Sequence, residues 1–138
     1  MSKSFYMRDK ANGHIHRTNE PSFWLQRGDE QLTEKHGKGL YKKQHADRLV
    51  NHIKESGNPI IYTLCHSVSS SGMSRNISLF IVSNNRIEDI THQAAIITNS
   101  KLSKNRGLIV KGLGFSAGQH IVEHLQYELK IELKHSWV

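Results

Sequence analysis

The sequence predicts an α+β fold with a small, mostly antiparallel sheet in the order β-β-β-α-β-α, preceded by an N-terminal arm and an amphipathic helix. Two observations predict this class. Runs rich in apolar and β-branched residues begin only after Pro59, and apolar residues at helical spacing occur before and between these runs. A length of 138 residues allows one core with an appended segment, which excludes a large multidomain enzyme.

The N-terminal part is expected to contain little regular structure. Residues 1 to about 39 are rich in His, Asn, Gly, Lys and Arg, and their aromatic residues follow no sustained period: Phe5, Tyr6, Phe23 and Trp24. Such a composition is typical of a flexible or meander-like arm that is held in place by its aromatic side chains.

An amphipathic helix is predicted from Leu40 to Glu55. Its apolar residues recur at helical spacing: Ala46, Leu49, Val50 and Ile53. The sequence Ser56-Gly57-Asn58-Pro59 ends this helix, because Gly suits the position after a helix and Pro59 disfavours helical geometry at Asn58. We therefore divide the chain into residues 1–57, an arm plus helix, and residues 58–138, an α+β ligand-binding core.

The core contains the regular pattern. The predicted strands are Ile60–Val68, Asn76–Ser83, Arg86–Ile90 and Gly107–Lys111. A short helix over Thr91–Ser100 presents Ile90, Ala94 and Ile97 on one face. The last helix starts near Ser116 and presents Ile121, Val122, Leu125 and Leu129 to the sheet.

The charge favours an anionic partner. The chain carries a formal charge of +7 and has a pI near 9.7. Residues 1–57 hold 11 basic and 7 acidic side chains, and residues 58–138 hold 8 and 5, so no basic tail supports nucleic-acid binding. We expect no membrane partner and a cytoplasmic location, because no apolar run spans a bilayer and no signal peptide is visible. The single cysteine, Cys65, is expected to be a buried small hydrophobic residue rather than a nucleophile, although His66 adjoins it.

The first candidate binding segment connects two predicted strands. It contains His66, Ser69, Ser71, Gly72, Met73, Ser74 and Arg75. Backbone N–H groups around Gly72 are expected to form an anion nest, and Arg75 can bind a phosphate through two hydrogen bonds. The alternative is an ordinary polar hairpin loop, because Ser and Gly are common turn residues.

The second candidate segment leads from a strand into the last helix. Its candidate ligand contacts are Lys111, Gly112, Gly114, Ser116 and Gly118. Small residues let a ligand approach the backbone, and a helix N-terminus favours an anion. The GxGxxxG spacing is neither the dinucleotide fingerprint nor a P-loop, so a close crossing of helix and sheet explains it equally well.

The sequence predicts no catalytic, metal or cofactor site. His120 and His124 lie four residues apart on the last helix, but HExxH is absent and no third ligand can be named. No GxSxG motif or carboxylate pair is present either. Binding without turnover is therefore the predicted class of function.

Both candidate segments resemble motifs of a group of small phage-encoded proteins. The group carries H-x-V-S-x-S-G-M-S-R-x-I, which is nearly complete here from His66 to Ile77. It later carries G-C-G-M-D-M-G-F-x-[LI]-V, of which this chain keeps Gly112, Gly114, Gly118, Ile121 and Val122. Phe115, Ser116, Ala117 and Gln119 depart from the second motif. Because Ser116 replaces the acidic residue of the group, any role of that carboxylate, such as binding a ribose hydroxyl, is in doubt for this chain. The resemblance covers residues 59–130.

This group is similar to phage Thoeris anti-defence proteins, which are non-enzymatic sponges for cyclic ADP-ribose isomers. The resemblance implies a homo-oligomer in the host cytoplasm that sequesters a nucleotide-derived anionic small molecule on both segments. Two other functions stay open, a basic nucleic-acid-binding phage accessory protein and a protein inhibitor of a host enzyme.

Overall fold

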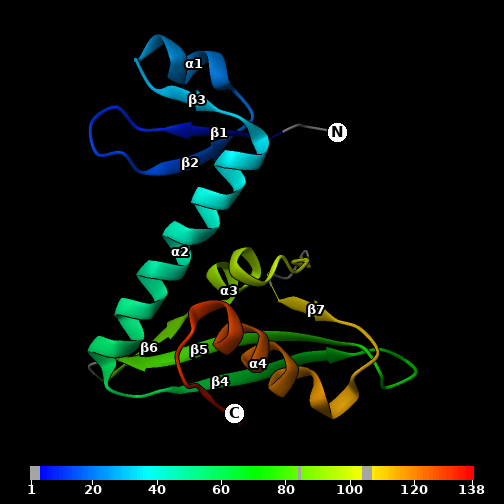
Figure 1. Cartoon of the computed structure of the whole chain (residues 1–138). Coiled ribbons are helices and arrows are strands. Elements are labelled where there is room, and N and C mark those ends of the chain that lie inside the picture. The colour runs from blue at the N-terminus through cyan, green and yellow to red at the C-terminus, as the bar shows by residue number, and fades with distance from the viewer. Residues whose placement is uncertain (1–3, 84, 104–106) are drawn as a thin grey trace. The chain divides into compact units, whose positions relative to one another are not determined.

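The computed structural model describes residues 4–83, 85–103 and 107–138, and Figure 1 shows its helices and strands. The protein has an α+β fold with one small antiparallel sheet and one mixed sheet, as the sequence predicted for the class. The chain divides into two compact units between His45 and Ala46. The boundary predicted from the sequence lies after Gly57. The difference arises because the last turns of the long helix place Leu49 and Ile53 in the core of the second unit.

The first unit contains a three-stranded antiparallel sheet with a small core, so of the two forms expected for the arm, flexible or meander-like, the flexible one is wrong. Its elements are β1 (Phe5–Arg8), β2 (Ile15–Thr18), α1 (Pro21–Gln26) and β3 (Glu30–Leu32), and the strand order is β2-β1-β3. A small core of Tyr6, Ile15 and Leu32 holds the sheet, with Leu40 and Tyr41 packed against it.

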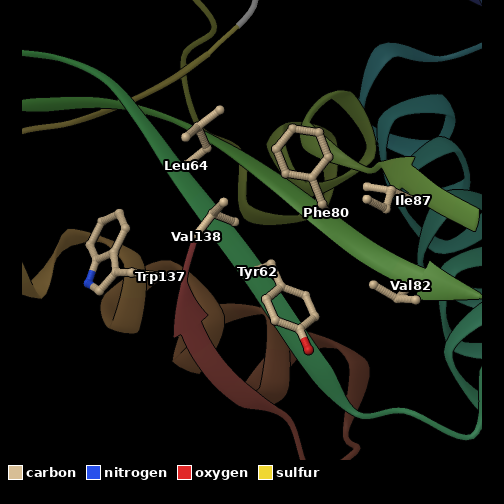
Figure 2. A pocket seen from close by; sticks show the side chains of 7 residues that line it. All are labelled: Tyr62, Leu64, Phe80, Val82, Ile87, Trp137 and Val138. Carbon is tan, nitrogen blue, oxygen red and sulfur yellow. The ribbon is translucent and has the colours of Figure 1, made fainter.

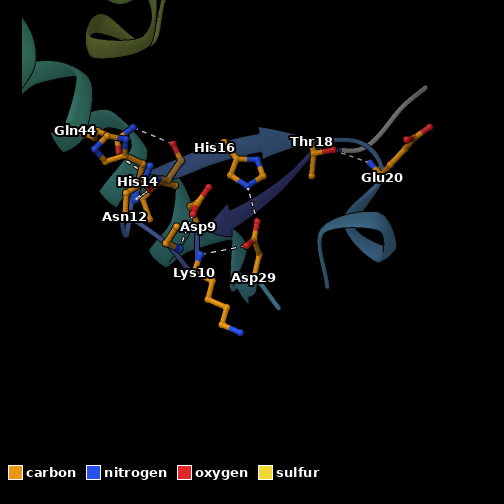
Figure 3. A network of polar contacts seen from close by, with 11 residues as sticks. Asp9, Lys10, Asn12, His14, His16, Thr18, Glu20, Asp29 and Gln44 are labelled. Carbon is orange, nitrogen blue, oxygen red and sulfur yellow. Dashed lines mark hydrogen bonds and ion pairs between the residues drawn. The ribbon is translucent and has the colours of Figure 1, made fainter. Parts of the chain in front are cut away.

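Polar contacts connect the turns of this unit, as Figure 3 shows. The Asp29 carboxylate accepts a hydrogen bond from the Lys10 backbone N–H (3.1 Å) and lies 3.3 Å from His16 Nε2. The Gln44 side-chain oxygen accepts a hydrogen bond from the Ile15 N–H (2.7 Å), and the Gln44 side-chain nitrogen donates one to the Ile15 carbonyl (2.9 Å). The Gln44 amide thus pairs with both backbone polar groups of Ile15 at the outer edge of β2, where the described residues form no further strand.

Helix α2 (Glu34–Ser56) is longer than the predicted helix and begins six residues earlier. The Thr33 hydroxyl accepts the His36 N–H (3.3 Å), which caps the first turn. Further along, Leu49 and Ile53 are buried as predicted, and the helix ends before Gly57, whose φ is +67°.

The second unit contains the mixed sheet. Its strands are β4 (Ile60–Val68), β5 (Arg75–Ser83), β6 (Arg86–Asp89), β7 (Leu108–Val110) and β8 (Lys134–Trp137). The order is β6-β5-β4-β8, and β7 pairs with the first residues of β5. All these pairs are antiparallel except β4 with β8, which is parallel. Strand β8 was not predicted, because Lys134–Trp137 contains a single large apolar residue and shows no alternation.

Besides the last turns of α2, the second unit has three helical segments, which lie on one face of the sheet (Figure 1). They are α3 (Thr91–Thr98), the short 3-10 helix η1 (Gly114–Ser116) and α4 (Ala117–Leu129). The predicted inward residues are buried, including Ala94, Ile97, Ile121 and Leu125. They pack against alternate residues of β4 and β5, which are Ile61, Thr63, Ile77, Leu79 and Ile81.

Candidate functional site

The two segments selected from the sequence lie side by side. The Gly114 N–H donates to the Met73 carbonyl (2.8 Å), which joins the turn before α4 to the β4–β5 loop. The antiparallel register pairs Arg75 with Val110, so the chain after β7 starts beside the same loop. Residues Ser69–Arg75 and Lys111–Ser116 together are called the two-segment site below.

The β4–β5 loop uses its own polar groups to hold its shape. The Gly72 N–H donates to the Ser69 carbonyl (2.9 Å), and the Ser74 N–H donates to the Ser69 hydroxyl (3.1 Å). Met73 N–H lies 3.4 Å from the Ser71 hydroxyl, which is 3.1 Å from that of Ser69. The anion nest expected around Gly72 stays a prediction, and the N–H groups of Gly72, Met73 and Ser74 have acceptors within the loop. The side chains of Arg75 and Lys111 are left as the cationic groups of the site.

Arg75 stacks on an aromatic ring. Its guanidinium carbon lies 4.5 Å from the centroid of the Phe115 ring, which is 83% exposed. Its Nη1 is 4.0 Å from the Cys65 sulfur, and its buried Nε has no hydrogen-bond partner in the described part of the chain. No carboxylate among the described residues forms an ion pair with it. Arg75 thus holds a positive charge that no carboxylate in the described part of the chain compensates.

The turn before α4 needs glycine for its backbone. Gly112 and Gly114 have φ values of +77° and +52°, in the left-handed region that favours glycine. Lys111 is exposed before this turn, and Ser116 is the residue before α4, whose side chain makes no capping bond. Two of the three glycines of the motif are thus explained by backbone geometry.

Gly118 has a different role, since it is buried within α4. A Cβ atom there would lie 2.8 Å from Thr63 Oγ1 and only 2.4 Å from His135 Nε2. These two atoms are hydrogen-bonded to each other (2.6 Å), and burial lowers the pKa of His135 from its usual 6.5. Gly118 is therefore a packing position of the fold and lies among core residues rather than in a ligand path.

His66 is not brought together with Arg75. His66 Nε2 lies 2.5 Å from the hydroxyl of Ser78, whose neighbours Ile77 and Leu79 point into the core. Because side chains alternate along a strand, Ser78 and His66 belong to the face opposite the helices. The alternation of side chains between the two faces of the sheet along β4 could have shown that His66 lies on a different face from the other candidates.

Cys65 is partly buried and packs against the core, close to its predicted role. Its sulfur lies 3.5 Å from the Ser67 carbonyl. Since the His66 ring is engaged with Ser78, the two neighbours do not form a nucleophile and base pair.

The described residues contain no group of three or more His, Cys, Asp or Glu side chains arranged to hold a metal ion. His124 instead lies 3.6 Å from the Glu128 carboxylate, and His120 is exposed. Among the helices that the structure describes, none is long and apolar enough to cross a membrane. Comparison with known protein families, curated proteins and solved structures gives no match.

Proposed function

We propose that the protein binds and sequesters a nucleotide-derived signalling molecule, such as a cyclic ADP-ribose isomer, and releases it unchanged. The observation that carries the proposal is the uncompensated Arg75 guanidinium stacked on the exposed Phe115 ring, where both motif segments meet. Together with the resemblance of these segments to phage motifs, this favours an anti-defence role in the host cytoplasm.

Two chemical features of a nucleotide match this arrangement. A phosphate can accept two charge-assisted hydrogen bonds from Arg75, and Lys111 adds a second positive charge. A base can stack on the solvent side of Phe115, a kind of contact worth about 1–3 kcal/mol. The internal hydrogen bonds of the β4–β5 loop reduce the entropy that the loop loses on binding.

Binding without turnover fits the groups around the site. Phosphoryl or glycosyl transfer needs a positioned base, a nucleophile or a metal. Arg75 has no carboxylate paired with it in the described residues, and His66 lies on the other face of the sheet. The two-segment site thus offers cationic and stacking groups but no acid and base pair.

A second candidate function is nucleic-acid binding by the first unit. Helix α1 buries none of its residues, and Phe23 is 49% exposed. The Arg27 guanidinium lies over the rings of Phe23 (5.7 Å) and Trp24 (5.8 Å). Surface arginine and aromatic side chains of this kind stack on the bases of single strands. The third function, inhibition of a host enzyme, is favoured by no contact in the described residues.

Thermal shift and calorimetric titration with cyclic ADP-ribose isomers, other cyclic nucleotides and short oligonucleotides test these proposals. A ligand at 100 times its dissociation constant stabilises the native state by about 2.7 kcal/mol, which raises the melting temperature by roughly 10 °C. Arg75→Ala and Phe115→Ala should each weaken binding at least about tenfold. Arg86→Ala is the matched control, because Arg86 is an exposed arginine at the other end of β5.

Two results would contradict the proposal. One is an absence of binding to every nucleotide in the panel. The other is binding of oligonucleotides that Phe23→Ala abolishes and Arg75→Ala leaves intact, which would support the second candidate instead.

A further inference from the structure

The face of the mixed sheet opposite α3 and α4 contains a hollow of about 460 Å³. Figure 2 shows the side chains that line it, which are Tyr62, Leu64, Phe80, Val82, Ile87, Trp137 and Val138. Tyr62 and Leu64 alternate along β4 with the buried Ile61 and Thr63, so they point away from the helices. The volume of the hollow lies within the range of about 300–1,000 Å³ that is typical of small-molecule sites.

The lining of the hollow is apolar and uncharged. Among the described residues that form it, none is Asp, Glu, Lys or Arg, although the whole chain carries a formal charge of +7. A phosphate or carboxylate placed in the hollow would lose its hydration without gaining a cation, which is costly. The aromatic rings of Tyr62, Phe80 and Trp137 instead favour offset or edge contacts with a flat ring. The hollow therefore selects an uncharged ligand that contains a ring system.

Two polar atoms belong to the side chains of the lining, the Tyr62 hydroxyl and the Trp137 indole nitrogen (Figure 2). Neither forms a hydrogen bond with another side chain in the part of the chain that the structure describes. The hydroxyl can donate or accept a hydrogen bond, and the indole N–H can only donate one. An oxygen atom of the ligand, in a hydroxyl or carbonyl group, can accept a hydrogen bond from either of them.

A small molecule fits this hollow better than a protein partner does. Stable protein interfaces take about 20–30 residues from each side, whereas seven residues line the hollow. We propose that the hollow binds a neutral small molecule that has an aromatic or alicyclic ring system and at least one hydroxyl or carbonyl oxygen. The ligand would cover part of Ile87, which is 75% exposed on β6.

This site does not rest on the proposed nucleotide site. The Arg75 guanidinium lies near the Cys65 sulfur and the Phe115 ring, and Cys65 packs against the core on the helix side of the sheet. The hollow is on the opposite face, so either site can be lost without the other.

Fluorescence titration of the full chain with 6-propionyl-2-(dimethylamino)naphthalene, a neutral naphthalene ketone, tests the proposal. We expect saturable binding of one ketone molecule per chain. Ile87→Glu should weaken this binding at least about tenfold without changing the melting temperature, because it places a carboxylate in the lining at a mostly exposed position. Tyr127→Glu is the matched control, since Tyr127 is 78% exposed on α4 and lies in the other layer. Arg75→Ala should also leave the affinity for the ketone unchanged.

Two further measurements test the chemistry of the ligand. N-phenyl-1-naphthylamine and 8-anilinonaphthalene-1-sulfonate have the same rings and differ by the sulfonate, so the neutral compound should displace the ketone at a several-fold lower concentration. The double variant Tyr62→Phe with Trp137→Phe keeps an aromatic ring at both positions and removes both polar atoms. It should bind the ketone several-fold more weakly than the wild type does.

The proposal is overturned by a ketone titration that does not saturate, or by an Ile87→Glu protein that binds the ketone as tightly as the wild type. Displacement by the sulfonate at an equal or lower concentration would refute the selection of a neutral ligand. An unchanged affinity of the double variant would refute the assignment of a ligand oxygen. Loss of ketone binding in Arg75→Ala would place the ketone at the two-segment site and contradict a separate site on this face.

Discussion

Adding one methyl group at Gly118 should destabilise the protein more than a glycine-to-alanine change elsewhere in a helix. The new Cβ would lie 2.4 Å from His135 Nε2 and 2.8 Å from Thr63 Oγ1, so either these side chains or α4 must shift. Overpacking of this kind costs about 1–3 kcal/mol. Displacing the His135 ring also breaks its 2.6 Å hydrogen bond and leaves the fully buried Thr63 hydroxyl without a partner, at a cost of about 1–3 kcal/mol.

Alanine gains about 1 kcal/mol over glycine in helix propensity, which offsets part of this loss. The expected net effect of Gly118→Ala is about 3 kcal/mol, or a melting temperature roughly 10 °C lower. Gly39→Ala in α2 is the matched control, because a Cβ there meets nothing within 4 Å. The control should leave the melting temperature unchanged or raise it slightly.

Differential scanning calorimetry of both variants measures these effects, and a double mutant locates their origin. If the clash is with the imidazole, Gly118→Ala should cost little when His135→Ala has already removed the ring. A Gly118→Ala protein that melts within about 1 °C of the wild type would refute the close packing of α4 on β8.

The remaining predictions concern titration and chain length. Because the folded-state pKa of His135 lies below 6.5, the unfolded chain binds more protons in this range, and stability falls as the pH drops below 6.5. His135→Gln removes that contribution, so its melting temperature should depend less steeply on pH between 7.5 and 5 than that of the wild type; an equal slope would contradict the burial of this ring. A shortened chain that begins at Leu40 keeps Leu49 and Ile53 for the second core and should still unfold cooperatively in calorimetry, whereas a gradual transition would show that the first unit is required for the fold.

The long strands and the apolar helix faces could be predicted from the sequence, because their periods extend over many residues. Ile60–Val68 and Arg75–Ser83 each have nine residues, and the buried face of α4 repeats over three turns. The strands of the first unit and β8 have only three or four residues each, which is too short for a period to show. Strands β6 and β7 are equally short, but the Asn84-Asn85 turn before β6 and the apolar run of β7 indicated them. Their pairing depends on partners distant in the sequence, such as Gln44 for Ile15 and β4 for β8.

The candidate site likewise has parts that could be predicted from the sequence and parts that depend on contacts between distant residues. Both motif segments were selected from the sequence, but the stacking of Arg75 on Phe115 joins residues 40 positions apart and needs the fold to be seen. The packing role of Gly118 could not be predicted either, because His135, the side chain that it packs against, follows 17 residues later. His66 was selected with the other residues of the site, although the alternation along β4 could have placed it on the other face of the sheet.

Calorimetric titration of the full chain with cyclic ADP-ribose isomers, followed by heat denaturation and chromatography of the released ligand, tests the central proposal most directly. We expect saturable binding, which Arg75→Ala should weaken and Arg86→Ala should leave unchanged. We also expect the released ligand to be recovered in its original form. An altered product in the released fraction, or a titration in which Arg75→Ala binds as tightly as the wild type, would contradict it.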